Sequence, residues 1–224
     1  MSERTDLPRT GFASSEQLAG RLRIAIRART LCALLLVDLD RFGDFNRRFG
    51  RARGDRAVRR LMDAVRAWAR RSEALIAAEA HDTFSALIER AGPERGIREA
   101  LILQRASACA VGSRREQCTV SVGVALAPNE GTSAARLRAR AESALERAKA
   151  DGGDAVGVAI ARTAVSVHAG ERAEVARALS LIRDRSNRQG PRRNARALSA
   201  QTRPPLERRR TLRPTRRTHA RRRG

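Results

Sequence analysis

The sequence predicts one α/β (α+β) domain, a mixed sheet with helices packed on it, followed by a disordered basic tail. Helix-like and strand-like hydrophobic patterns alternate up to residue 160, as in a single sheet covered by helices. The nearly continuous apolar run LCALLLVDLD suits a central strand buried on both faces. From Ser186 onward the chain has 14 Arg, four Pro and no aromatic residue. Such a segment buries too little apolar surface to offset the entropy of ordering it.

The first half of the domain is expected to contain two helices and the central strand. SSEQLAGRLRIAIRAR has an apolar residue every four positions, which predicts a helix capped by Ser14 or Ser15. LCALLLVDLD predicts the strand, and a short polar segment follows it. GDRAVRRLMDAVRAWARR predicts a second helix behind an Asp55 N-cap. Its apolar side chains keep helical spacing: Val58, Leu61, Val65 and Trp68.

The second half is expected to begin with a hairpin. EALIAAEAHDTFSALIE predicts two short strands around a turn, and ERGIREALILQRASA predicts a helix. CTVSVGVALA alternates apolar and small or polar residues, which is typical of a strand. TSAARLRARAESALERAKA predicts a helix that ends at DGGD, and AVGVAI predicts a last short strand. These patterns place the domain at residues 1–160, a linker helix at 161–185 and the disordered tail at 186–224.

The formal net charge of +23 is unevenly distributed, with +15 after residue 160 and +8 before it. Lys149 is the only lysine, so the basicity consists almost entirely of arginine and reflects a GC-rich codon bias as much as an anionic partner. An arginine-rich tail would bind nucleic acid or an anionic surface without sequence preference. Since the tail has no aromatic side chain to stack on bases, we expect at most a non-specific electrostatic arm.

Three cysteines without CxxC spacing suggest reduced thiols. No apolar run reaches the roughly 18 residues of a membrane span, and the N-terminus has no signal-peptide pattern. The expected location is therefore cytoplasmic.

Two aspartates end the apolar strand, where they are costly unless they are solvated, capped or bound to metal. By themselves they fit an ordinary turn. Their surroundings, VDLDRFGDFNRRFGRARGD, resemble the nucleotide-binding segment of the GGDEF family, the diguanylate cyclases. The positions that match in type and spacing are Asp38, Leu39, Asp40, Phe42, Asn46, Gly50, Gly54 and Asp55. DLPRTGF, VSVGVA and AESALERAK resemble other family motifs, so the resemblance runs from Asp6 to Ile160.

This resemblance implies a nucleotidyl-cyclase-like sheet wrapped by helices. In the family, two domains meet, each with one GTP, and form cyclic di-GMP with the help of Mg²⁺. Carried over by position, Asp38, the Leu39 carbonyl and Asp82 would hold metal, and Asp82 would be the catalytic residue. The guanine contacts would come from Asn46 and Asp55, and the phosphate contact from Lys149. Ordinary structural roles compete with these: a helix N-cap at Asp55, a turn cap at Asn46 and a solvated last-turn cation at Lys149.

The family signature falls on AHDTF, residues 80–84, where most of it is altered. Asp82 keeps the acidic third position, but Ala80 and His81 replace two glycines whose bare backbone approaches the triphosphate. An ungapped count from Asp55 would instead place His81 at the metal position. The second acid becomes Thr83, and Gly153 stands where a phosphate-binding Arg is usual.

Losing one electrostatic donor commonly costs ~10² to 10³ in rate. We therefore predict a catalytically impaired GGDEF domain of cyclic di-GMP pathways. It would bind GTP or another guanine nucleotide, or dimerise with itself or another GGDEF protein. Two alternatives stay open. One is an active diguanylate cyclase that relies on the retained acids and Asn46, and the other is non-specific binding through the tail.

Overall fold

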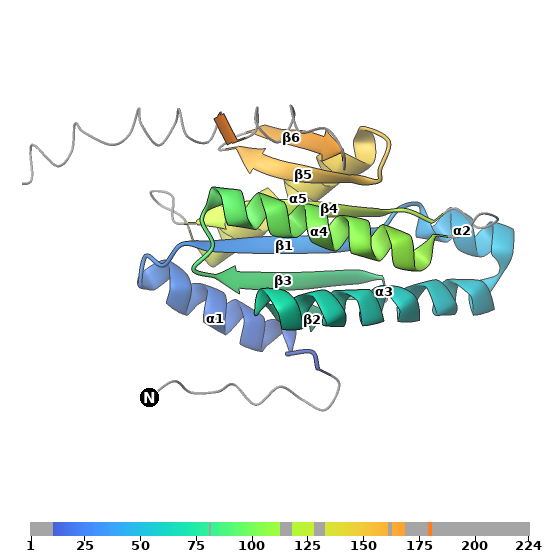
Figure 1. Cartoon of the computed structure of the whole chain (residues 1–224), viewed down its shortest axis with the longest axis horizontal. Helices are drawn as coiled ribbons and strands as arrows, with labels where there is room; N and C mark the ends of the chain where they lie inside the picture. The colour runs from blue at the N-terminus through green and yellow to red at the C-terminus, as the bar shows by residue number, and fades with distance from the viewer. Residues whose placement is uncertain are drawn as a thin grey trace, which may run out of the picture. The chain divides into compact units, whose positions relative to one another are not determined.

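The computed structural model describes residues 11–80, 82–112, 118–127, 133–160, 163–168 and 179–180. Within them, six strands form one mixed sheet in the order β2-β3-β1-β4-β5-β6 (Figure 1). Only the β4–β5 pair is parallel. The predicted α/β fold with a mixed sheet is confirmed. The elements are α1 Ser15–Arg27, β1 Cys32–Leu39, α2 Phe42–Phe49, α3 Arg51–Ser72, β2 Leu75–Ala78, β3 Thr83–Glu89, α4 Pro93–Val111, β4 Val120–Ala127, α5 Ala134–Ala150, β5 Ala155–Ile160 and β6 Thr163–His168.

Strand β1 is the centre of the domain, and every one of its residues is buried. Successive side chains of a strand point to opposite faces. On one face Leu35 and Val37 pack with α3 and α4, and on the other Leu34 and Leu36 pack with α1 and α5. Helices therefore cover both faces of the sheet, and the continuous apolar run of β1 follows from that double burial.

Several local predictions are confirmed. Ser14 is the N-cap of α1: its hydroxyl accepts from the Gln17 amide at 3.1 Å, and the Gln17 side chain accepts from the Ser14 amide at 2.8 Å. This reciprocal pair is a capping box. The hairpin at residues 75–89 forms as β2 and β3, and the valines of β4 alternate into the core beside α4.

The segment after β1 differs from the prediction. The expected short polar segment is helix α2, in which Phe45 is buried and stacks near Phe49 with ring centroids 4.9 Å apart. Gly50, with φ of +84°, separates α2 from α3. Since α3 begins at Arg51, Asp55 lies inside its first turns and is not the N-cap. The signal for this helix was the spacing of Phe42, Phe45 and Phe49, three and four positions apart, within an otherwise polar segment.

The sheet also extends beyond residue 160, where the domain was expected to end. Strand β6 pairs with β5 in antiparallel register from Ala155↔His168 to Ile160↔Thr163, and Val167 is buried in the core. The alternation in TAVSVH was the available signal. Within the expected linker helix, 161–185, residues 163–168 are therefore strand, and of the rest only Leu179–Ser180 are described, as helix. The tail from residue 186 lies outside the described residues.

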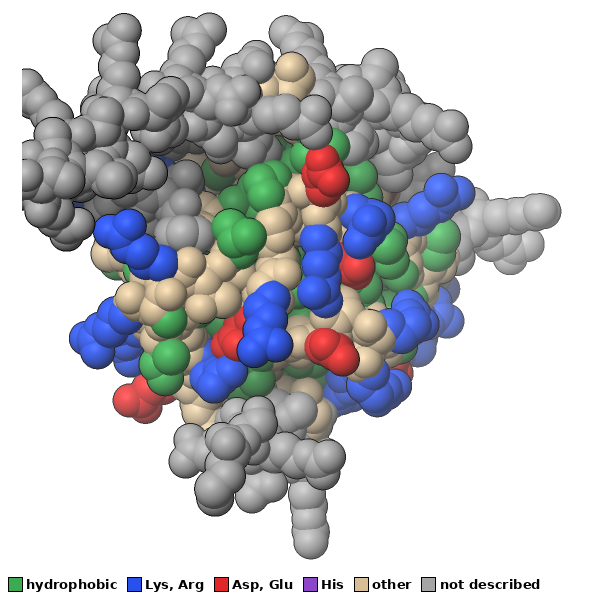
Figure 2. Space-filling view, turned by 60° about the vertical axis from the view of Figure 1, so that its left-hand side comes forward, with side chains coloured by type: hydrophobic (Ala, Val, Ile, Leu, Met, Phe, Trp, Pro, Cys, Tyr) green, Lys and Arg blue, Asp and Glu red, His purple; other side chains and the backbone are tan. Residues whose placement is uncertain are grey.

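The described surface carries charges of both signs. On the face drawn in Figure 2, basic and acidic side chains are interspersed among apolar ones. Three large apolar side chains among the described residues are exposed: Ile24, Leu31 and Ile102. None of the described helices is long and apolar enough to cross a membrane.

Candidate functional site

Asp38 lies near the carboxyl end of β1, on the sheet face covered by α1 and α5, and is only 9% exposed. Its two oxygens have different partners. The Thr83 hydroxyl, directly across on β3, donates to Oδ2 at 2.7 Å. The ammonium of Lys149, in the last turn of α5, lies 2.7 Å from Oδ1. The buried carboxylate is thus balanced by one cation and one neutral hydroxyl.

Asp40 serves a structural purpose at the same end of β1. The Thr119 and Ser121 hydroxyls each donate to its carboxylate at 2.7 Å, and the Asp154 amide donates at 2.9 Å. It therefore joins the start of β4 to the loop between α5 and β5. A Cβ on Gly153, whose φ is +81°, would lie 2.8 Å from Asp40 Oδ2. A side chain at position 153 would therefore be strained by the backbone conformation and would crowd the Asp40 carboxylate.

The predicted guanine-binding residues meet where α2 contacts α3. The Asn46 side chain lies against Gly54: a Cβ there would be 1.8 Å from Asn46 Oδ1. Asp55 follows directly in α3 and is exposed. Asn46 Oδ1 is buried and has no hydrogen-bond partner among the described residues. An unpaired buried acceptor is costly unless a ligand or water donates to it. The structure thus places the Asn46 amide against Gly54, the residue before Asp55 in α3; the guanine-binding roles of Asn46 and Asp55 stay predictions.

The hairpin turn is closed by backbone bonds. The amides of Glu79 and Ala80 both donate to the Thr83 carbonyl, at 3.0 and 3.3 Å. Ala80 is exposed and Asp82 is partly exposed. His81 lies outside the described residues, so its expected exposure stays a prediction.

The carboxylate of Asp38 is already paired within the protein, so it is not free to bind the metal that the resemblance implies. Metals of this kind prefer several oxygen ligands. Both oxygens of Asp38 already have protein partners, and no group of three His, Cys, Asp or Glu side chains gathers anywhere in the described ranges. The metal and catalytic roles of Asp38, Leu39 and Asp82 therefore stay predictions.

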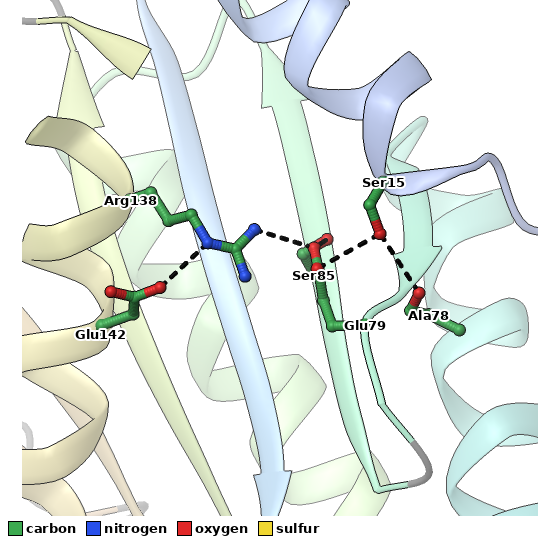
Figure 3. Close-up of polar contacts among 6 residues, drawn as sticks. All are labelled: Ser15, Ala78, Glu79, Ser85, Arg138 and Glu142. Carbon is green, nitrogen blue, oxygen red and sulfur yellow. Dashed lines mark hydrogen bonds and ion pairs between the residues drawn. The ribbon is translucent and has the colours of Figure 1, made fainter. Parts of the chain in front are cut away.

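A second polar cluster, which the sequence did not predict, lies on the same sheet face (Figure 3). Glu79, the first residue after β2 in the hairpin turn, accepts from the Ser85 hydroxyl at 2.6 Å and from Arg138 of α5 at 3.0 Å. The Ser15 hydroxyl donates to its other oxygen at 3.2 Å. Arg138 also donates to Glu142 at 2.9 Å. The cluster ties the hairpin to α1 and α5.

This cluster sets the charge of Glu79. Burial alone would raise the pKa of Glu79, but the hydrogen bonds from Arg138 and Ser85 and the positive charge of Arg138 hold it below its ordinary 4.5. A carboxyl group with a lowered pKa stabilises the fold above its unfolded pKa and loses that contribution as pH falls through the folded value.

We expect Glu79→Gln to lower the free energy of unfolding by about 2 kcal/mol near pH 7, because Arg138 then loses the less exposed of its two charged partners, Glu79 and Glu142. The difference from wild type should shrink as pH falls below about 4.5. Urea unfolding at several pH values measures it. The exposed Glu142→Gln is the control and should cost less than about 1 kcal/mol. A Glu79→Gln effect that is constant down to pH 3 would contradict a charge-based role.

The sequence profile described as "Diguanylate cyclase, GGDEF domain" matches residues 5–155. The chain belongs to the GGDEF family. No curated protein matches it closely enough to report.

Solved GGDEF domains share this fold. The GGDEF domain of DgcB from Caulobacter crescentus, crystallised with c-di-GMP, is 20% identical, with a TM-score of 0.59 over 71% of this chain and 99% of that one. The active GGEEF domain of a diguanylate cyclase from Vibrio cholerae is 18% identical, with a TM-score of 0.59 over 66% and 97%. The GGDEF domain of TpbB (YfiN) from Pseudomonas aeruginosa is 26% identical, with a TM-score of 0.59 over 68% and 93%.

Proposed function

We propose that this GGDEF domain is a catalytically impaired regulatory module of cyclic di-GMP signalling that binds a guanine nucleotide between α2 and α3. Family membership supports the pathway. The corner formed by Asn46, Gly54 and Asp55 supports base recognition, because an amide and a carboxylate together can satisfy the donors and acceptor of a guanine edge.

The observation that carries the impairment is the state of Asp38. In the family this acid would serve the metals, whereas here Thr83 and Lys149 occupy both of its oxygens. Thr83 has no charge to offer a metal. Gly153, which lies against Asp40, has no side chain and so cannot supply a positive charge to the phosphates. Each lost electrostatic contact costs ~10² to 10³ in rate, and the losses act on one site.

Incubation of the purified protein with GTP and Mg²⁺ should therefore yield cyclic di-GMP at least ~10³ times more slowly than an active GGDEF domain assayed beside it. Chromatography of the nucleotide products measures the rate. Turnover within about tenfold of the active domain would contradict the proposal and favour a functional cyclase that uses Asp82.

Calorimetric titration with GTP tests the binding half of the proposal. Heat in the wild type that is lost in Asn46→Ala and retained in Asp63→Asn, an exposed control on α3, supports guanine binding between the two helices. If the wild type gives no heat, the binding half is wrong, and a purely dimerising role takes its place. Sedimentation of the domain alone and mixed with another GGDEF protein would then measure that role.

A further inference from the structure

The pairing of Asp38 with Lys149 has a consequence for the ligand. We propose that Lys149 is a resident counter-ion that takes the place of a divalent metal at Asp38, so that the domain selects its ligand by the guanine base and not by a metal-bound triphosphate. The proposed class is a guanine nucleotide of any phosphate length, bound without metal. This inference rests on the proposed guanine site.

The charges at Asp38 balance without an added ion. Its side chain is 13% exposed and that of Lys149 is 31% exposed, so their 2.7 Å contact is only partly screened by solvent. Thr83 contributes a hydroxyl, whose proton is directed to Asp38. An acid at position 83 would add a negative charge beside Asp38, and the threonine does not. The Asp38 carboxylate and the Lys149 ammonium together carry no net charge, so they attract a metal cation weakly.

A divalent ion would also have to displace an existing partner. To reach Asp38 Oδ1 it must displace the Lys149 ammonium, whose next carboxylate, Glu146, lies 4.0 Å away and is 75% exposed. Mg²⁺ demands near-octahedral oxygen coordination. Among the described residues, no group of three His, Cys, Asp or Glu side chains is gathered that could bind the ion and offset the loss of the Asp38–Lys149 contact.

The same contact removes the cation that a triphosphate would use. Lys149, the only lysine in the chain, is held by Asp38, and position 153 is a glycine. The α2–α3 corner, in contrast, depends on neither residue. Additional phosphates should then add little to affinity, since differences in affinity come from contacts that differ between the ligands.

Calorimetry with GTP and GMP, each in Mg²⁺ and in EDTA, tests this selection. We expect all four dissociation constants to agree within about threefold. GTP binding that exceeds GMP binding by about tenfold in Mg²⁺ and falls to the GMP value in EDTA would overturn the inference. If no nucleotide binds under any condition, the proposed guanine site is wrong, and so is the proposed selection by the base. The counter-ion role of Lys149 is tested separately, by metal binding.

Titration of the protein with Mn²⁺ alone, followed by electron paramagnetic resonance, provides that second test. The wild type and the cation-preserving Lys149→Arg should show no tight Mn²⁺ binding, whereas Lys149→Met with Thr83→Glu should gain it. Tight binding by the wild type, or none by the double variant while it still unfolds cooperatively, would overturn the counter-ion role. Should the double variant fail to fold, Lys149→Met alone is used, with the same expected gain.

Discussion

Replacing Gly157 with valine should cost more than about 4 kcal/mol of unfolding free energy and leave little folded domain. Gly157 lies in β5, beneath α5. A Cβ at this position would lie 1.8 Å from the Ala144 carbonyl oxygen and 2.5 Å from its carbonyl carbon. These are backbone atoms, so no side-chain rotation relieves the overlap, and the whole helix would have to move away from the sheet.

The cost is large because α5 packs at the same close distance on β4. A Cβ on Gly123 would lie 2.2 Å from the Ala141 carbonyl oxygen. Pushing α5 outward therefore also exposes the core side chains Leu137 and Leu145. It would separate Lys149 from Asp38 as well, so the effect reaches the candidate site.

Urea unfolding monitored by circular dichroism measures this loss. The matched control is Gly43→Val in the exposed part of α2, where a Cβ meets nothing within 4 Å. Glycine and valine are both poor helix formers, so the control should stay within about 0.5 kcal/mol of wild type. If Gly157→Val loses less than about 1 kcal/mol, α5 does not pack on β5 as closely as described.

Hydrophobic periodicity predicted most of the fold because a buried face imposes its spacing on the chain. The valines of β4 and the continuous apolar run of β1 could be assigned on that basis. The pattern failed at α2, where arginines and an aspartate surround the buried Phe45. The prediction also stopped short of β6, whose alternating TAVSVH pairs with β5, the strand just before it in the chain, beginning at Ile160↔Thr163.

The site was only partly predictable for a different reason. The spacing of Asn46, Gly54 and Asp55 belongs to one local motif, and the structure places Asn46 against Gly54. Glu79 and Arg138 are 59 positions apart, and their 3.0 Å contact depends on how β2 and α5 lie on the sheet. The donation from Thr83 to Asp38 likewise needs the register of β1 against β3, which a single sequence does not determine.

Asp40→Ala should destabilise the domain by about 3 kcal/mol, because hydrogen bonds to a charged acceptor contribute more than neutral ones. The change removes the common acceptor of the Thr119 hydroxyl, the Ser121 hydroxyl and the Asp154 amide. Ser121 is fully buried, so its hydroxyl would lose its partner without gaining water. Asp44→Ala is the control: it removes an exposed carboxylate that pairs with Arg47 three positions along the same helix and should cost less than about 1 kcal/mol.

The position of the residues that lose protection from hydrogen exchange distinguishes a structural role of Asp40 from a general loss of charge. Hydrogen exchange in Asp40→Ala should speed up first at the Asp154 amide, which donates directly to the missing carboxylate, and then along the start of β5. Asp40→Asn should fall between the wild type and the alanine variant, since an amide oxygen still accepts but carries no charge. Unchanged exchange at Asp154 in Asp40→Ala would contradict the structural role. A confined loss would show that the second aspartate of the strand holds the loop after α5, and with it the end of the helix that presents Lys149 to Asp38.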